Sequence, residues 1–276
     1  MRRMTLYILL GIIVSITIAG IAFLHQPNFG RLPKGERLER IKRSPNYREG
    51  VFRNIDTTIL MTSHKSRLSG IWSFLFRKVE GLRPDEPIPA IKTDLRKIPL
   101  EENTLVWFGH SSYLLQVDEK RILVDPVFCM ASPVSFVNKP FRGTEIYSPD
   151  DMPDIDYLVI SHDHWDHLDY HTVKQLKGRI GKVVCPLGVG EHFEHWGFDK
   201  SRIIELDWKE SATLSQQFII HCLPSRHFSG RGLTPNQTLW ASFLLETPDR
   251  KIFIGGDGGY GSHLKQIGEQ FPDIDL

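Results

Sequence analysis

The stretch Ser161–His167, SHDHWDH, directly follows the apolar run IDYLVI at 155–160 and decides how this 276-residue chain folds. Those seven residues hold three histidines and two aspartates. A short apolar run rich in β-branched residues predicts a buried strand, so the polar side chains begin where that strand ends. Because His162 and His164 are two residues apart, their imidazoles leave an extended backbone on the same side and can share one ion.

The motif continues with Asp166 and His167, which follow after the chain has turned. They bring a carboxylate and a third imidazole to a place where a second ion can sit. Zn²⁺ takes imidazole nitrogen and carboxylate oxygen, and a catalytic site leaves one position open to water. The alternative is a polar loop in which Asp166 caps the next helix, but that reading does not explain why so many ligand-type side chains follow a buried strand.

The overall composition supports a globular domain and excludes some partners. Hydrophobic residues make up 41% of the chain, and 34 Lys and Arg balance 33 Asp and Glu, so we expect no nucleic-acid partner. Cys129, Cys185 and Cys222 are widely spaced and form no CxxC pair, which favours neither a disulfide framework nor a thiolate zinc site. A metal in this chain would therefore be held by histidine and aspartate.

Residues 1–25 predict a membrane anchor. Thr5–Leu24 carry no charge, and their 20 residues match the roughly 20 that a helix needs to cross the hydrocarbon core. A cleaved signal peptide is the alternative, because Gly20 and Ala22 are small, but the apolar run exceeds the usual signal core of about 7–15 residues. We expect a single-pass membrane protein that contacts the lipid bilayer through this helix. Basic residues after the helix favour a cytoplasmic domain, yet long domains translocate regardless, so both sides stay open.

Residues 26–100 are a basic, proline-containing lead-in, and residues 101–276 have the pattern of an enzyme domain. In the lead-in, RPDEPIP predicts an extended connector, and the segment is expected to wrap the domain. The domain begins with the antiparallel runs TLVWFG, YLLQVD and RILVDP. Helices DYHTVKQLKGR and GEHFEHWG then alternate with strands, and FIIHCLP, LWASFLLET and KIFIGG end the pattern. This predicts an α/β fold of two sheets covered by helices.

The spacing of the motif resembles the signature of the metallo-β-lactamase superfamily. That resemblance implies an αβ/βα sandwich with two metals at one edge, a third ligand of the first metal much later in the chain, and a bridging aspartate later still. The strand FIIHCLP is followed by His227 and the strand KIFIGG by Asp257, which are positions suited to ligands on a rigid scaffold. The implied arrangement has two Zn²⁺, the first held by His162, His164 and His227, the second by Asp166 and His167, with Asp257 bridging.

Four longer stretches are similar to a narrower branch, which contains N-acylphosphatidylethanolamine-hydrolysing phospholipase D and its bacterial relatives. They are WFGHSSYLLQVDEKRILVDPVF, WGFDKSRIIELDW, HFSGRGLTPNQTLWASF and GGDGGYG. This resemblance implies hydrolysis of a phosphodiester in a small-molecule or lipid substrate by water activated on the two metals, with Asp166 and Asp257 as the catalytic carboxylates. A lactonase or other carbonyl hydrolase is one alternative, and an inactive membrane-anchored relic or binding module is another.

The end of the chain departs from that branch, whose members carry one more histidine ligand and further strands beyond the bridging aspartate. Here only His263 follows Asp257, and it lies in the predicted helix SHLKQIGEQF, which matches no ligand position. We expect either a domain truncated at its C-terminus or a weakly bound second metal.

Two more residues stand at strand ends near the motif. His110, in FGHSS, is expected to orient a ligand or touch substrate, with loop packing as the alternative. Asp125, in LVDP, can orient a ligand histidine or can begin an Asp-Pro turn.

Overall fold

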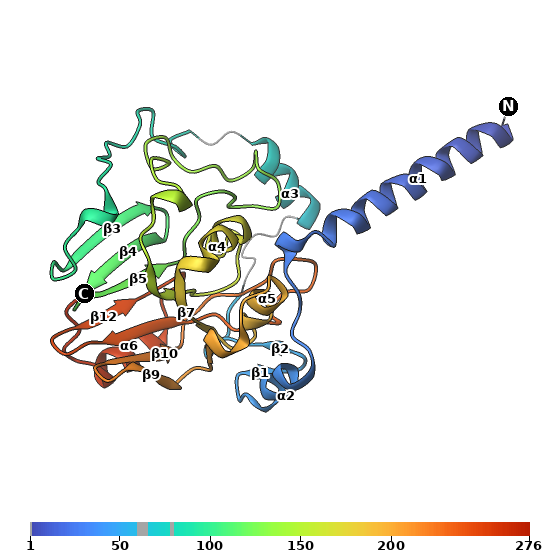
Figure 1. Cartoon of the computed structure of the whole chain (residues 1–276). Coiled ribbons are helices and arrows are strands. Elements are labelled where there is room, and N and C mark those ends of the chain that lie inside the picture. Colours follow the sequence, from blue (N-terminus) through green and yellow to red (C-terminus); the bar gives the residue numbers. More distant parts are fainter. Residues whose placement is uncertain (1, 60–65, 78–79) are drawn as a thin grey trace.

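Two β-sheets packed face to face form the centre of the structure, a computed structural model that describes residues 2–59, 66–77 and 80–276 (Figure 1). The larger sheet has six strands in the order β3-β4-β5-β6-β7-β8, and the smaller has four in the order β12-β11-β10-β9. The strands of the larger sheet are β3 (Thr104–Gly109), β4 (Ser112–Val117), β5 (Lys120–Val124), β6 (Ile155–Val159), β7 (Ile180–Pro186) and β8 (Ile203–Leu206). Those of the smaller are β9 (Ser211–Ser215), β10 (Phe218–Leu223), β11 (Ser242–Glu246) and β12 (Lys251–Ile254).

The larger sheet changes direction at β5. Strands β3, β4 and β5 pair antiparallel, as the predicted meander requires, whereas β5, β6, β7 and β8 pair parallel. The crossovers between parallel strands carry the helices α4 (Tyr170–Leu176) and α5 (Gly190–His195). Because the carboxyl ends of parallel strands meet at one edge, the residues that follow β5 and β6 are neighbours there.

The buried side chains form three layers of core. Between the sheets, residues such as Ile122 of β5 pack with Phe243 of β11. On the outer face of the larger sheet, Leu158 lies under Val173 of α4 and Phe193 of α5. The outer face of the smaller sheet is covered by α6 (Ser262–Gln270). The chain therefore has the predicted mixed α/β arrangement, with helices outside two packed sheets.

One strand of the smaller sheet was not predicted. Strand β9 has the sequence SATLS, in which Leu214 is the only large apolar side chain, so its pattern gives no clear strand signal. It pairs antiparallel with β10, which supplies the apolar positions for both.

The lead-in forms regular structure and enters the core. It contains α2 (Gly35–Arg43), the short hairpin β1 (Tyr47–Arg48) and β2 (Val51–Phe52), and α3 (Arg67–Phe76), a helix that the sequence pattern did not predict. Ile41 of α2 and Phe52 of β2 are fully buried between the sheets. Part of the lead-in is thus packed as firmly as the strands that it covers.

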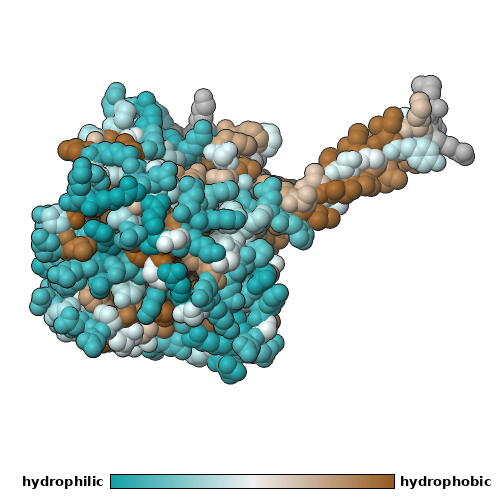
Figure 2. All heavy atoms as spheres, viewed as in Figure 1, coloured by the Kyte–Doolittle hydropathy of each residue, from teal (hydrophilic) through white to brown (hydrophobic). Residues whose placement is uncertain are grey.

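The N-terminal helix α1 (Arg2–Leu24) projects away from the body of the structure (Figure 1). Its residues Met4–Leu24 are long and apolar enough to cross a membrane, by length and composition. Figure 2 shows apolar side chains along most of this helix, in contrast to the largely hydrophilic face of the domain. The single turn Pro27–Phe29 (η1) then leads the chain back to the domain. Short 3₁₀ turns at Leu95–Lys97, Pro149–Asp151, Lys177–Arg179 and Lys200–Arg202 complete the described elements.

Candidate metal centre

Four strand ends deliver the predicted site residues to one edge of the two sheets. The motif Ser161–His167 begins two residues beyond the end of β6, and Asp125 directly follows β5. From the smaller sheet, His227 lies beyond the end of β10 and Asp257 beyond the end of β12. A rigid pair of sheets therefore fixes side chains that are far apart in the sequence.

Three histidines, His162, His164 and His227, form the first group of possible ligands, and one ring nitrogen of each lies within 4.8 Å of the others. His162 Nε2 and His227 Nε2 are 2.8 and 3.2 Å from His164 Nδ1. Zn–N bonds of about 2.0–2.1 Å in tetrahedral geometry place ligand nitrogens roughly 3.3 Å apart. The three nitrogens are thus spaced to hold one small divalent cation.

A second group lies beside the first and consists of His110, Asp166 and His167. His167 Nδ1 is bonded to Asp125 Oδ2 at 2.8 Å, which directs Nε2 to the other side. That Nε2 is buried and, within the described part of the chain, forms no hydrogen bond of good geometry, although Asp257 Oδ1 lies 3.4 Å away. A buried polar atom left without a partner is costly, and a bound cation would satisfy it. The donor set of imidazole nitrogen and carboxylate oxygen suits Zn²⁺ and related divalent ions.

Asp257 stands between the two groups. Its Oδ1 is 3.4 Å from His167 Nε2, and its Oδ2 is 3.7 Å from His227 Nε2. It also forms a third group of possible ligands with His162 and His167. One carboxylate thus faces histidines of both groups, which is the placement that a bridging ligand needs.

Asp125, which directly follows β5, fixes two residues of the motif, Ser161 and His167. Besides His167, it accepts hydrogen bonds from the Ser161 N–H at 2.7 Å and the Ser161 hydroxyl at 2.6 Å. Its side chain is fully buried and its φ is +42°, a backbone conformation that non-glycine residues rarely adopt. Such strain is retained where the surroundings impose it, and the Asp125 carboxylate occupies the Nδ1 side of the His167 ring through the contact at 2.8 Å.

The ionisation of the histidines differs between the two groups. Burial and the neighbouring imidazoles lower the pKa of His162 well below its ordinary value, and the same causes lower the pKa of His227 to about 4. Burial also lowers the pKa of His164, against the opposing charges of Asp163 and Asp166. The first group is therefore neutral at physiological pH, the state in which imidazole binds a metal.

His167 is the exception. Burial alone would lower its pKa, but the charges of Asp125 and Asp257 and their contacts raise the pKa of His167 to about 10. The contact with His167 in turn holds the pKa of Asp257 at about 2. Without a cation, the second group is therefore arranged around an imidazolium, which a bound cation would replace as the positive charge between the carboxylates.

Asp163, the one acid of the motif outside the ligand groups, is a buried anchor for the loop. Its carboxylate accepts hydrogen bonds from the Gly230 N–H at 2.7 Å and the Thr238 hydroxyl at 2.8 Å, and pairs with His192 Nε2 at 3.1 Å. Burial would raise its pKa, but His192 and the charges of His164 and Arg231 outweigh it and hold the pKa of Asp163 at about 2. The sequence marked this residue only as part of a ligand-rich motif.

Arg231 is a buried residue that bonds both the motif and the turn η1. Its buried guanidinium donates from Nη1 to the carbonyls of Asp163 and Leu168, at 2.9 and 2.6 Å, and so joins both ends of the loop. From Nε and Nη2 it donates to the Asn28 carbonyl of η1, at 3.1 and 2.8 Å. It also lies 4.3 Å from the centroid of the Trp165 ring, a cation–π contact. Arg231 thus ties the motif to the segment that follows α1.

The segment Pro27–Arg31, which we call the strut, makes further contacts with the domain and with α1. Phe29 packs edge-on against Trp165 at 5.0 Å between ring centroids, and against Phe23 of α1 at 5.2 Å. The Arg31 N–H is bonded to His192 Nδ1 at 3.0 Å, and Trp196 Nε1 donates to the Pro27 carbonyl at 2.7 Å. The strut therefore lies between the last turn of α1 and the motif Ser161–His167, and its Phe29 packs on both.

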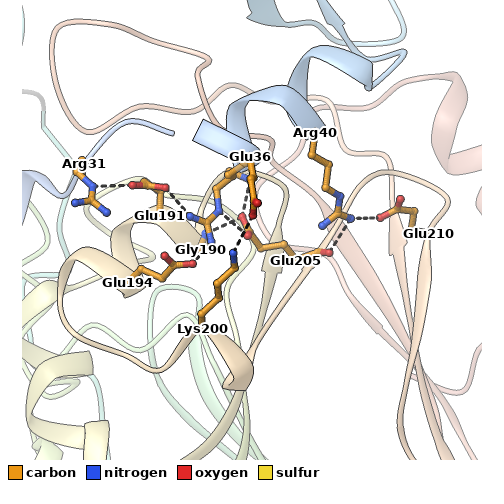
Figure 3. Close-up of polar contacts among 11 residues, drawn as sticks. Arg31, Glu36, Arg40, Gly190, Glu191, Glu194, Lys200, Glu205 and Glu210 are labelled. Carbon is orange, nitrogen blue, oxygen red and sulfur yellow. Dashed lines mark hydrogen bonds and ion pairs between the residues drawn. The ribbon is translucent and has the colours of Figure 1, made fainter. Parts of the chain in front are cut away.

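An ion-pair cluster fastens the next part of the lead-in to α5 and β8 (Figure 3). Arg31 pairs with Glu191 at 2.6 Å, and Arg40 pairs with Glu210 at 2.7 Å. Between them the nearly buried Arg37 contacts the carboxylates of Glu191, Glu194 and Glu205. Burial would lower the pKa of Arg37, but these three partners raise it above its ordinary value. Arg31, Arg37 and Arg40 of the lead-in are thus directed onto the domain.

All six predicted ligands lie in these groups, together with His110, which the sequence placed as an orienting or substrate-contacting residue. His263 lies elsewhere, buried on α6 beside Asp56, and belongs to none of the groups found among the described residues. Asp163, His192 and Arg231 were missed, because a single buried polar residue, whether in a loop or on a short helix such as α5, carries no periodic signal.

Comparison with known proteins adds a family and several relatives. The sequence model of the beta-lactamase superfamily domain matches residues 120–276. An uncharacterized protein of Mycobacterium tuberculosis is 39% identical over 240 residues, which cover 85% of this chain and 63% of that protein. N-acyl-phosphatidylethanolamine-hydrolyzing phospholipase D 1 of Caenorhabditis elegans is 32% identical over 62% of this chain and 51% of its own length. A protein of Pyrobaculum neutrophilum described as a UPF0173 metal-dependent hydrolase is 24% identical over 62% of this chain and 68% of its own. The chain thus spans less than two thirds of the mycobacterial and nematode relatives.

Proposed function

This chain belongs to the beta-lactamase superfamily, and from that premise we propose that it is a two-zinc hydrolase acting on a phosphodiester of a membrane lipid. The metal-ligand roles in this proposal are those that the motif resemblance implies. His162, His164 and His227 hold the first cation, Asp166 and His167 the second, and Asp257 faces both.

The observation that carries the proposal is an apolar cavity that opens beside the second ligand group. This cavity, of about 340 Å³, is lined in part by His110 and Asp166. Its walls are largely aromatic and apolar and include Trp107, Phe108, Phe128, Met130 and Phe141. A substrate whose polar, hydrolysable group meets the carboxylates and whose apolar part fills the cavity is an amphiphile, such as a lipid.

The side chains of the site have separate tasks in this reaction. A pair of divalent cations, when bound, activates water and stabilises charge on the attacked and leaving oxygens. Asp125 keeps the Nδ1 side of His167 occupied, so that only Nε2 faces the site. Asp166 and Asp257 are the carboxylates within reach of the reacting group, and the cavity excludes water from the apolar part of the substrate.

The N-terminal helix supports a lipid as the substrate. A helix suited to crossing a bilayer ends at Leu24, a few residues before the strut that touches Trp165 of the motif. An enzyme tethered in this way meets bilayer substrates at high local concentration. The nematode relative is named for the hydrolysis of a phospholipid. Membrane fractionation tests the tether: the full chain should stay in the pellet after carbonate or high-salt washing, and its release would contradict the proposal.

A substrate panel tests the chemistry. The zinc-loaded chain should hydrolyse bis-p-nitrophenyl phosphate and N-acylphosphatidylethanolamine, and Asp257→Asn should abolish both activities. Preferential turnover of acyl lactones would favour a carbonyl hydrolase instead. A correctly folded chain that takes up no metal would identify a binding module or relic.

A further inference from the structure

We propose that His110 is a protein ligand of the second cation, so that this position is completed by the turn between β3 and β4. The inference rests on the proposed function, since it concerns the same metal centre. It differs from the arrangement implied by the motif alone, in which Asp166, His167 and the bridging Asp257 face the second cation.

The distances favour this role. His110 Nε2 is 3.4 Å from Asp166 Oδ2, and the rings of His110 and His167 lie edge to face with centroids 5.1 Å apart. The possible ligand atoms of His110, Asp166 and His167 all lie within 4.8 Å of one another. That spread is compatible with bonds of about 2.0–2.2 Å to a common ion after small side-chain adjustments.

The backbone of the turn is shaped to aim this one ring. His110 has φ +45°, in the left-handed region that costs non-glycine residues energy, and it follows Gly109 at φ +103°. The pairing of β3 with β4 shifts register between Trp107 and Gly109, as a β-bulge does when it redirects a side chain. A histidine held in a strained conformation where a glycine would relax it calls for a reason in the side chain.

Two further contacts fix the turn to the rest of the site. Trp107 Nε1 donates to the His110 carbonyl at 2.9 Å. The Ser112 hydroxyl donates to the Asp125 carbonyl at 2.7 Å, which joins the turn to the residue that orients His167. His110 and His167 are therefore positioned by one shared support, as two ligands of one ion would need to be.

The resulting donor set is chemically complete. Two imidazole nitrogens, from His110 and His167, and two carboxylates, from Asp166 and Asp257, give four ligands of the kinds that zinc accepts. The side chain of His110 is 54% exposed and lines the apolar cavity, so the second position is open on the side from which substrate enters. His110 would thus join the second cation to the wall of the substrate cavity.

The test uses cobalt as a spectroscopic replacement for zinc in the full chain and in three variants. His110→Ala removes the imidazole, His110→Cys replaces it with a thiolate ligand, and His171→Ala removes an imidazole on α4 outside the ligand groups. Circular dichroism and thermal unfolding establish that each variant is folded. Cobalt affinity and stoichiometry are measured by titration, and the ligand field by visible absorption.

We expect two cobalt ions per wild-type chain. His110→Ala should keep the first and bind the second at least about 10-fold more weakly. His110→Cys should recover the second ion and gain a thiolate-to-cobalt charge-transfer band that the wild type lacks, and His171→Ala should match the wild type. Wild-type binding of both ions by His110→Ala would overturn this inference and leave the proposed function standing. A wild-type chain that binds no ion would refute the proposed function itself, and this inference with it.

Discussion

Asn54 of the lead-in holds the backbone of His227 at two points. Its Nδ2 donates to the His227 carbonyl at 2.9 Å, and the His227 N–H donates to Asn54 Oδ1 at 3.1 Å. Trp240 Nε1 donates to the same oxygen at 3.1 Å and fixes the amide from the other side. A residue of the lead-in, far from His227 in the sequence, therefore fixes the backbone of a ligand of the first group.

Replacing Asn54 by Ala should weaken the first cation site by about 10–100-fold, the usual effect of removing a support behind a metal ligand. The measurement is zinc affinity by competition with a chromophoric chelator. Asn46→Ala is the matched control, because Asn46 is also a lead-in asparagine but bonds Asp207, away from the ligand groups. Equal zinc affinities for the two variants would show that the hydrogen bonds between Asn54 and His227 have no role in metal binding.

Metal uptake at the second position should release about one proton per chain from His167 at pH 7.5. The metal-free pKa of His167 is raised to about 10, so this ring is protonated at pH 7.5 and must lose its proton to bind. The pKa values of His162, His164 and His227 are lowered, so the first position should release almost none. Calorimetric titration in two buffers of different ionisation enthalpy measures the released protons. A second binding step whose heat does not depend on the buffer would contradict this prediction.

The same raised pKa sets a stability window for the metal-free chain. The pKa of His167 in the folded chain lies above its ordinary value near 6.5, so protonation of His167 stabilises the metal-free fold. This contribution to the free energy of unfolding is complete below about pH 6.5 and disappears as the pH rises through about 10.

Arg37→Met should destabilise the chain by about 3–5 kcal/mol, because it leaves buried carboxylates without their cation. Glu191 is nearly inaccessible to solvent, and Arg37 itself is 9% exposed. Thermal and urea unfolding of the metal-free chain provide the measurement. The control is Lys42→Met, which removes the exposed pair with Glu39 and should cost no more than about 1 kcal/mol. Similar losses for both variants would mean that the cluster does not hold the lead-in in place.

Gly30→Ala should disturb the strut and, through it, the motif. A Cβ at Gly30 would lie 2.1 Å from Nδ1 of His192, whose other ring nitrogen is bonded to Asp163. Gly35→Ala is a close control, since Gly35 also has positive φ but its Cβ would meet nothing within 4 Å. Both variants should lose the stability that a strained alanine costs, about 1 kcal/mol, and only Gly30→Ala should also lose cobalt affinity. Unchanged cobalt affinity in Gly30→Ala would show that the strut does not influence the motif Ser161–His167.

The sequence predicted the features that follow from apolar periodicity and from the spacing of ligand-type residues. The two-sheet arrangement followed from alternating strands and helices, and the clustering of the motif residues from their position after a buried strand. His227 and Asp257 were added by the family resemblance. The sequence could not predict that Asn54, Arg231 and His192 support those groups, because each acts through one or a few hydrogen bonds that only the folded chain creates. The sequence also predicted that the lead-in only wraps the domain. Ile41 and Phe52, which are fully buried, are too isolated in the sequence to form a periodic apolar pattern.

The contact of the strut with Trp165 has a mechanical consequence. Only two ring contacts, Phe23 to Phe29 and Phe29 to Trp165, separate the last turn of α1 from the loop that carries His164 and Asp166. A force applied along α1 would therefore reach this loop without first passing through either sheet. Of the two sheets and the motif, the motif is therefore the part that lies nearest to α1 along these ring contacts, and it carries one ligand of each group, His164 and Asp166.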